Sequence, residues 1–341
     1  MSRPTALVIA PGRGTYNKTE LGYLKRHHTG EAALFASFDA QRAKRGQGPI
    51  TDLDGASRYS VAKFTRGDNA SGLIYACSYA DFRSLAEDKV EVVAVTGNSM
   101  GWYTALACAG AVSGEDGFRV VNTMGTLMQD QLIGGQILYP FVDEDWQEIP
   151  GKRDELLALT EDIPGLFLSI RLGGMLLFGG MEDALAAAMD RLPPLEAGFP
   201  LRLHNHAAFH TPLQAPVSAL GKTELPASLF TQPRVPLIDG RGHTWHPGAC
   251  DLEALWDYTF GHQVVAPYDF TAAVRTGIRE FAPDMIVILG PGTTLGGAVA
   301  QVLVAEDWRG VTGKAAFKAV QEREPVVVSM GMEGQLRATV D

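Results

Sequence analysis

Residues 91–111 read EVVAVTGNSMGWYTALACAGA, and this stretch decides the fold of the chain. A β-branched apolar run leads into the turn at 97–101, and an alanine-rich run follows it. This order predicts a buried strand, a sharp turn and a helix, with Ser99 at the apex of the turn. Gly97 and Gly101 flank Ser99 at the G-x-S-x-G spacing. Glycine is needed at both positions, because side chains there would keep the strand and helix backbones apart.

The expected turn gives Ser99 a chemical role. Its hydroxyl would stand above the sheet, and the amide of Met100 would point from the helix N-terminus to the place where a tetrahedral oxyanion forms. We therefore interpret Ser99 as a nucleophile. The alternative is an ordinary glycine-rich turn in which the serine only caps the helix.

The bulk properties are those of a globular protein. A chain of 341 residues suits one large domain with an elaboration, or two domains. The apolar run before Pro11 is too short for a signal peptide or a membrane span, so we expect a cytoplasmic protein with no membrane partner. The three cysteines are widely separated and form neither a disulfide framework nor a metal knuckle. Nothing in the sequence demands an oligomer, and we expect a monomer.

Charge is unevenly distributed along the chain. The formal net charge of −10 argues against nucleic acid as a partner. Between Arg13 and Arg66, however, ten basic residues stand against five acidic ones. This segment could dock an acidic partner or a phosphate group. A solvated helical surface with scattered charges explains the same pattern.

Strands that alternate with helices predict an α/β protein. Residues 284–289, for example, form an apolar run typical of a buried parallel strand. Residues 134–204 differ, because their order of strand, helix, two strands, helix and strand is that of a ferredoxin-like unit. We predict an α/β-hydrolase-like domain with a parallel sheet, formed by residues 1–133 and 205–341, and a ferredoxin-like subdomain inserted at 134–204.

A serine nucleophile needs a base, and the chain offers eight histidines. His204, His206 and His210 cluster where the chain returns from the insertion. Their spacing resembles a run of metal ligands, but no distant carboxylate or cysteine ligand accompanies it, so we predict no metal site. His210 precedes Thr-Pro at an expected helix start and is the better base.

Four short motifs follow one another along nearly the whole chain. They are Ala10 to Thr15, Gly97 to Gly101, Ala208 to Leu213, and Gly290 to Gly292 with Leu295 after it. In this order they resemble the first-strand turn, the Gly-His-Ser-x-Gly elbow, the Ala-Phe-His-Ser-x-Leu stretch and the late Gly-Pro-Gly of the malonyl-CoA:acyl-carrier-protein transacylase family. The related acyltransferase domains of polyketide synthases share this pattern, and the family's ferredoxin-like insert is similar to the one predicted here.

The resemblance implies a ping-pong acyl transfer. Ser99 would attack a thioester of coenzyme A, His210 would take its proton, and the phosphopantetheine thiol of an acyl-carrier protein would then accept the acyl group. The amides of Arg13 and Met100 would form the oxyanion hole. Acyl-CoA and the carrier protein are thus the implied partners, with no bound cofactor. The family orients its histidine with backbone carbonyls near the late glycine turn, so we assign no acid.

Some residues differ from the family pattern, and these differences bear on which acyl group the protein would bind. Met124 replaces the arginine that pairs with the malonyl carboxylate, and methionine cannot form such a pair. A malonyl group then needs another arginine, for which Arg13 and Arg171 are candidates; Arg171 could equally be a solvent-facing residue of an edge strand. Asn98 replaces the elbow histidine. Phe209 resembles the family's small-substrate variants and implies a short, unbranched acyl chain.

Two other functions are compatible with the same residues. In the first, water replaces the carrier thiol, and the Ser99–His210 pair hydrolyses acyl thioesters. In the second, the chain is a weakly active relative retained as a scaffold partner of a synthase. For the transferase, we expect the basic residues between 18 and 66 to dock the acidic carrier protein.

Overall fold

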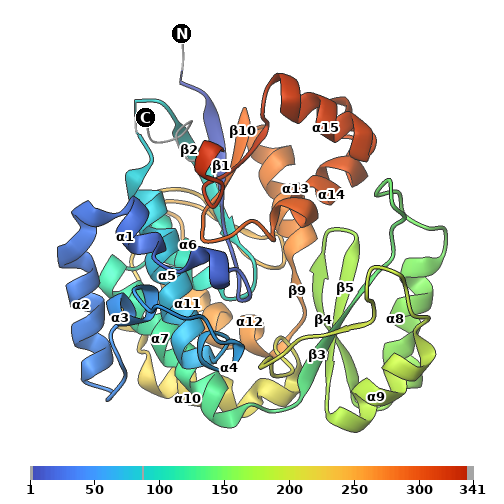
Figure 1. The fold of residues 1–341 in the computed structure, drawn as a ribbon, viewed down its shortest axis with the longest axis horizontal. Helices are drawn as coiled ribbons and strands as arrows, with labels where there is room; N and C mark the ends of the chain where they lie inside the picture. Colours follow the sequence, from blue (N-terminus) through green and yellow to red (C-terminus); the bar gives the residue numbers. More distant parts are fainter. Residues whose placement is uncertain (1–2, 87, 336–341) are drawn as a thin grey trace.

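The chain folds around two β-sheets, as the computed structural model of residues 3–86 and 88–335 shows (Figure 1). The larger sheet has the order β11-β10-β1-β2-β7-β8, and all its neighbouring strands are parallel except β7 and β8. Its strands are β1 (Thr5–Ala10), β2 (Glu91–Gly97), β7 (Leu237–Ile238), β8 (Thr244–Trp245), β10 (Met285–Ile288) and β11 (Val327–Ser329). This mostly parallel sheet confirms the predicted α/β class.

Helices cover both faces of this sheet. Figure 1 shows α5 and α6 on one side of it and α13 and α14 on the other. The helices outside the smaller sheet are α1 (Tyr23–His27), α2 (Ala32–Ala43), α3 (Ile50–Asp54), α4 (Val61–Phe64), α5 (Gly67–Ser84), α6 (Gly101–Cys108), α7 (Gly114–Gln131), α10 (Ala215–Glu224), α11 (Leu252–Phe260), α12 (His262–Val265), α13 (Phe270–Phe281), α14 (Gly296–Ala305) and α15 (Lys314–Arg323). Covered on both faces, the central strand β1 is fully buried from Ala6 to Ala10.

Local capping sets helix boundaries that the apolar pattern alone does not give. The apolar spacing predicts a helix from residue 117, but α7 begins three residues earlier. The reason is Ser113, whose side chain accepts a hydrogen bond from the Asp116 amide and satisfies one of the free donors of the first turn. Asp269 caps α13 in the same way, through the Ala272 amide.

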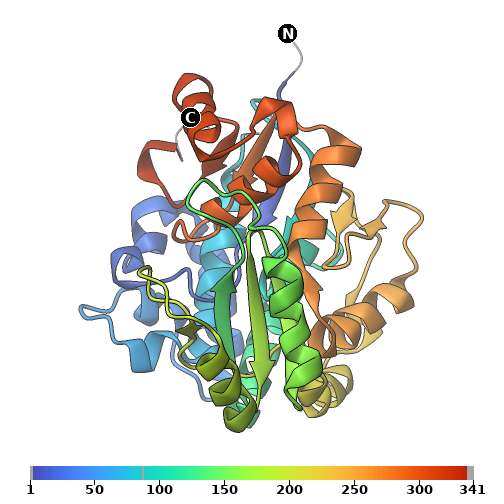
Figure 2. The same ribbon diagram turned by 90° about the vertical axis from the view of Figure 1, so that its right-hand side faces the viewer.

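The smaller sheet has the predicted order of elements. It is built from β3 (Gly135–Pro140), α8 (Lys152–Asp162), β4 (Leu166–Leu172), β5 (Met175–Gly180), α9 (Glu182–Arg191) and β6 (Leu201–Arg202). These strands pair antiparallel in the order β6-β3-β5-β4, and Figure 2 shows α8 and α9 covering the outer face. Its buried apolar side chains, such as Leu176 and Phe178, form a cluster separate from the main core.

A fifth strand links the two parts of the molecule. β9 (Tyr268–Asp269), which lies just before α13, pairs with β4 in parallel. The sequence does not predict this strand, because two residues carry no alternating pattern. Across residues 3–86 and 88–335, no helix has both the length and the apolar character needed to cross a membrane.

Candidate active site

The turn between β2 and α6 brings backbone segments into very close contact. A Cβ atom at Gly97 would overlap the carbonyl of Gly101, and one at Gly101 would overlap the carbonyl of Ala10. Only glycine therefore fits at either position, as the spacing predicts. Ser99 itself has a φ of 55°, a left-handed conformation that costs backbone energy and is typical of residues held for a function.

Ser99 meets His210 across the site. Ser99 Oγ lies 2.7 Å from His210 Nε2, and His210 Nδ1 lies 2.6 Å from the carbonyl oxygen of Gln263. Because a carbonyl can only accept, Nδ1 must carry the proton, and Nε2 is left to accept the hydroxyl proton of Ser99. Burial lowers the pKa of His210 to about 4, so the ring is neutral at pH 7 and can act as a general base.

Gln263 holds both members of the pair. Its side-chain amide donates to the Ser99 carbonyl at 3.1 Å, and its Oε1 accepts from the Tyr103 hydroxyl at 3.1 Å. Gln263 lies in α12, so the carbonyl that orients His210 does not come from the turn at 290–292. That expectation was wrong. No local motif marks Gln263, and only the packing of α12 against the elbow reveals it.

A chain of buried hydrogen bonds supports the backbone next to His210. His206 Nδ1 lies 2.9 Å from Gln136 Oε1, Gln136 Nε2 donates to Ser169 Oγ at 2.6 Å, and Ser169 Oγ donates to the Phe209 carbonyl at 2.7 Å. His206 and His210 thus have polar partners of their own. Among the residues that the structure describes, no group of three or more histidine, cysteine or acidic side chains is placed to hold a metal ion.

A small cavity of about 20 Å³ lies above Ser99. Arg13 and Met100 line it together with Phe209 and His210. The two residues whose amides were expected to form an oxyanion hole therefore lie at the same cavity as the nucleophile. Gly125 and Met128 of α7 form another part of its wall.

Three residues expected at the substrate are placed elsewhere. Met124 is fully buried and points to α10, where its Sδ would lie only 2.7 Å from a Cβ atom on Gly221. The face of α7 toward the cavity is formed instead by Gly125 and Met128. Arg171 pairs with Asp269 at 3.5 Å beside a separate pocket of about 140 Å³.

Asn98 is the third of these residues. Its side chain packs against Gly12, and its Oδ1 is buried without a hydrogen-bond partner. It does not line the cavity of Ser99.

No protein-family model matches the chain, and no curated protein matches its sequence. The structure, by contrast, has the fold of malonyl-CoA:acyl carrier protein transacylases and of a polyketide synthase acyltransferase domain. The transacylase of Xanthomonas oryzae has a TM-score of 0.77 and 18% identity, with 100% of this chain and 99% of that chain covered. MCAT from Mycobacterium tuberculosis has a TM-score of 0.74 and 21% identity, with coverages of 99% and 100%. The acyltransferase domain from the second module of the salinomycin polyketide synthase has a TM-score of 0.73 and 18% identity, with coverages of 99% and 72%.

Proposed function

We propose that the protein is an S-acyltransferase that moves an acyl group from a coenzyme A thioester, through an ester on Ser99, to the phosphopantetheine thiol of an acyl-carrier protein. The observation that carries this proposal is the 2.7 Å contact between Ser99 Oγ and a neutral His210, whose proton is held on the opposite nitrogen by the Gln263 carbonyl. The fold shared with transacylases supports the same activity.

In the first half-reaction, Ser99 Oγ attacks the thioester carbonyl carbon while its proton passes to His210 Nε2. The resulting oxyanion accepts hydrogen bonds from the amides of Arg13 and Met100, each of which contributes about 3 kcal/mol to transition-state stabilisation. The carbon–sulfur bond then breaks, and His210 returns the proton to the departing thiolate. The products are acyl-Ser99 and free coenzyme A.

The second half-reaction runs the same steps in reverse with a new thiol. The carrier thiol gives its proton to His210 Nε2 and attacks the ester carbonyl, and Ser99 Oγ leaves with the proton that His210 returns. Hydrolysis would use water in place of this thiol.

The surface beside the site supports a carrier protein as the second substrate. A groove of about 290 Å³ borders Arg13, and Asn17, Tyr59 and Phe64 line it. Three exposed cations lie on the same segments of chain, namely Lys18, Arg58 and Lys63. Carrier proteins are acidic, so exposed cations on these segments would attract them and speed their encounter.

A chase experiment tests the proposal. The acyl-enzyme is formed with a radiolabelled acyl-CoA, separated from free CoA, and divided between buffer and buffer with phosphopantetheinylated carrier protein. A transferase moves the label to the carrier at least tenfold faster than to water. Equal loss of label in both samples would identify a hydrolase instead. A full biological function retained by Ser99→Ala would favour the scaffold alternative.

A further inference from the structure

The late glycine turn, residues 290–292, contacts the loop that carries the Arg13 amide. Gly292 has a φ of +71°, and a Cβ atom on it would lie 2.2 Å from the Thr15 carbonyl oxygen. Glycine at this position therefore lets the backbone of the turn lie directly against the backbone of the loop. Thr15 is buried, and its hydroxyl donates to the Gly12 carbonyl at 3.2 Å, one residue before Arg13.

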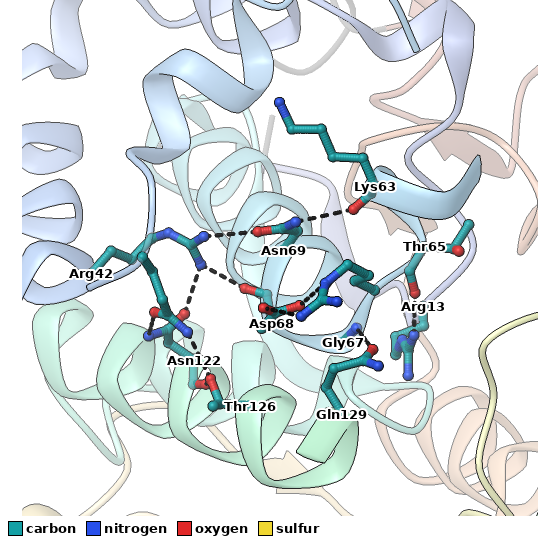
Figure 3. Close-up of polar contacts among 12 residues, drawn as sticks. Arg13, Arg42, Lys63, Thr65, Gly67, Asp68, Asn69, Asn122, Thr126 and Gln129 are labelled. Atoms are coloured by element: carbon teal, nitrogen blue, oxygen red, sulfur yellow. Dashed lines mark hydrogen bonds and ion pairs between the residues drawn. The ribbon is translucent and has the colours of Figure 1, made fainter. Parts of the chain in front are cut away.

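Two other parts of the chain also hold this loop. A Cβ atom on Gly12 would lie 2.7 Å from the carbonyl oxygen of Asn98, so the loop packs against the turn that carries Ser99. The Arg13 guanidinium donates to the carbonyls of Thr65 and Asn205, and Figure 3 shows the first of these contacts. The position of the Arg13 amide therefore depends on several neighbours, and the late glycine turn is one of them.

Two buried side chains of α5 hold the late glycine turn at its first residue. The Asp81 carboxylate accepts a hydrogen bond from the Gly290 amide at 2.6 Å, and the Ser78 hydroxyl donates to the Gly290 carbonyl. Asp81 and Ser78 are both fully buried. Each backbone polar group of Gly290 thus has a side-chain partner, and these two bonds fix the orientation of the peptide groups where the turn begins.

Asp81 is itself held in one position by a buried polar cluster. His28 Nε2 lies 2.6 Å from its Oδ1, and the Tyr23 hydroxyl donates to its Oδ2 at 2.9 Å. A Cβ atom on Gly290 would lie 2.2 Å from the Tyr23 hydroxyl oxygen, so the turn lies directly against this cluster. A buried cluster whose members are all hydrogen-bonded is rigid and fixes one arrangement of its neighbours.

We infer that Asp81 is a positioning residue for acyl transfer: by holding the late glycine turn, it holds the Arg13 amide where the oxyanion forms. The inference rests on the proposed function and adds a residue of α5 to it. None of the partners of the Asp81 carboxylate lines the cavity of Ser99, so Asp81 acts through the turn and the loop. Because a donor stabilises an oxyanion only when it is aligned with it, a small displacement of the loop should slow the reaction.

The first test measures the acylation of Ser99 by acyl-CoA in two Asp81 variants, with rates from quenched-flow mass spectrometry. Asp81→Ala removes the acceptor of the Gly290 amide and should lower the acylation rate about tenfold, with KM changed less than twofold. Asp81→Asn keeps one side-chain oxygen that can accept from this amide, and it should restore the rate to within about threefold of the wild-type rate.

Ser78→Ala is an independent variant, because it releases the same turn through the Gly290 carbonyl. It should slow acylation about threefold to tenfold. Tyr75→Phe is its matched control, since it also removes one buried hydroxyl of α5 that donates to a carbonyl, in this case that of Gly114 at 2.8 Å. Tyr75→Phe should leave the acylation rate unchanged, although it too removes a buried hydrogen bond.

A second readout separates the loss of oxyanion stabilisation from a general loosening of the protein. Ser99 Oγ adds to the carbonyl carbon of a trifluoromethyl ketone analogue of acetyl-CoA while its proton passes to His210, and the ketone oxygen becomes an oxyanion in the hole. In Asp81→Ala, the affinity for this analogue should fall by the same factor as kcat/KM. The affinity for free coenzyme A should stay within about twofold of the wild-type value.

The outcomes separate this inference from the proposed function. A folded Asp81→Ala that is acylated as fast as wild-type protein, or that is slow but binds the ketone as tightly, overturns the role of Asp81 and leaves the transferase in place. Should Asp81→Ala fail to fold, the comparison of Ser78→Ala with Tyr75→Phe decides, and equal rates in these two variants overturn the inference.

If no acyl-CoA acylates wild-type Ser99, the proposed function falls, and the role of Asp81 is tested with a fluorophosphonate. Phosphonylation of Ser99 also places a negatively charged oxygen in the oxyanion hole. A rate about tenfold lower in Asp81→Ala then supports the positioning role, and an equal rate overturns it.

Discussion

Replacing Gln263 should both destabilise the protein and slow the acylation of Ser99. Replacing it by alanine removes the hydrogen bond to the Ser99 carbonyl and the one from the Tyr103 hydroxyl, both 3.1 Å long. The Tyr103 side chain is buried, so its hydroxyl would lose its partner without gaining water. One lost bond of about 1 kcal/mol and one unsatisfied hydroxyl of about 1–3 kcal/mol give a destabilisation of roughly 2–4 kcal/mol.

The same change should slow acylation. The variant retains the backbone carbonyl of residue 263 that fixes the His210 tautomer, but it lacks the side chain that holds this carbonyl in place. We therefore expect the acylation rate to fall about 10- to 100-fold with little change in KM. Stability is measured by urea unfolding and acylation by quenched-flow mass spectrometry.

Tyr103→Phe is the control, because it removes only one of the two bonds and keeps the ring. It should cost about 1–3 kcal/mol, because the buried Gln263 Oε1 loses its donor, and change the acylation rate less than threefold. The reasoning is refuted if Gln263→Ala is as stable and as fast as wild-type protein, or if Tyr103→Phe slows acylation equally.

Three further predictions concern the elbow, the base and the docking surface. Gly101→Ala should destabilise the protein by roughly 3 kcal/mol, because the new Cβ would overlap the Ala10 carbonyl. Gly296→Ala, at the start of a helix with open space around it, should not change the stability. Equal melting temperatures of the two variants would contradict this prediction. Because the pKa of His210 is lowered to about 4, acylation should stay level from neutral pH down to about pH 5, and a rate that halves near pH 6.5 would contradict it. Between pH 6.5 and about 4, His210 is protonated in the unfolded chain but not in the folded protein. The free energy of unfolding should therefore fall as the pH falls through this window. Lys63→Glu should slow transfer to an acidic carrier protein by about 3- to 10-fold at low salt without changing acylation by CoA thioesters. Lys318→Glu on α15 should change neither rate. Transfer by Lys63→Glu at the wild-type rate and with the wild-type salt dependence would exclude this docking surface.

Features governed by local backbone geometry could be predicted from the sequence. The two glycines around Ser99 follow from sterics within five residues, and the alternation of strands and helices between 134 and 204 follows from side-chain periodicity. The apolar run at 166–172 predicts a strand, and β4 has the same bounds, Leu166–Leu172. Helix α7 needed the Ser113 cap to place its start.

Features that depend on side-chain direction or on distant contacts could not be predicted. The family resemblance gave the position of Met124 along its helix but not the side to which it points, and the same applies to Arg171 on β4. Gln263 is 53 residues from His210 in the sequence, so nothing local marks their contact. Arg13 donates to the carbonyls of Thr65 and Asn205, and these contacts between distant parts of the chain likewise have no local signal.

The role of Ser99 as the acyl carrier is tested by the intact mass of the protein after brief incubation with malonyl-, acetyl- and longer acyl-CoAs, followed by peptide mapping. We expect one acyl adduct, on Ser99, that is absent from Ser99→Ala and forms at least a thousandfold more slowly in His210→Ala. An adduct that persists in Ser99→Ala, or the absence of any adduct in protein whose Ser99 still reacts with a fluorophosphonate, would contradict it.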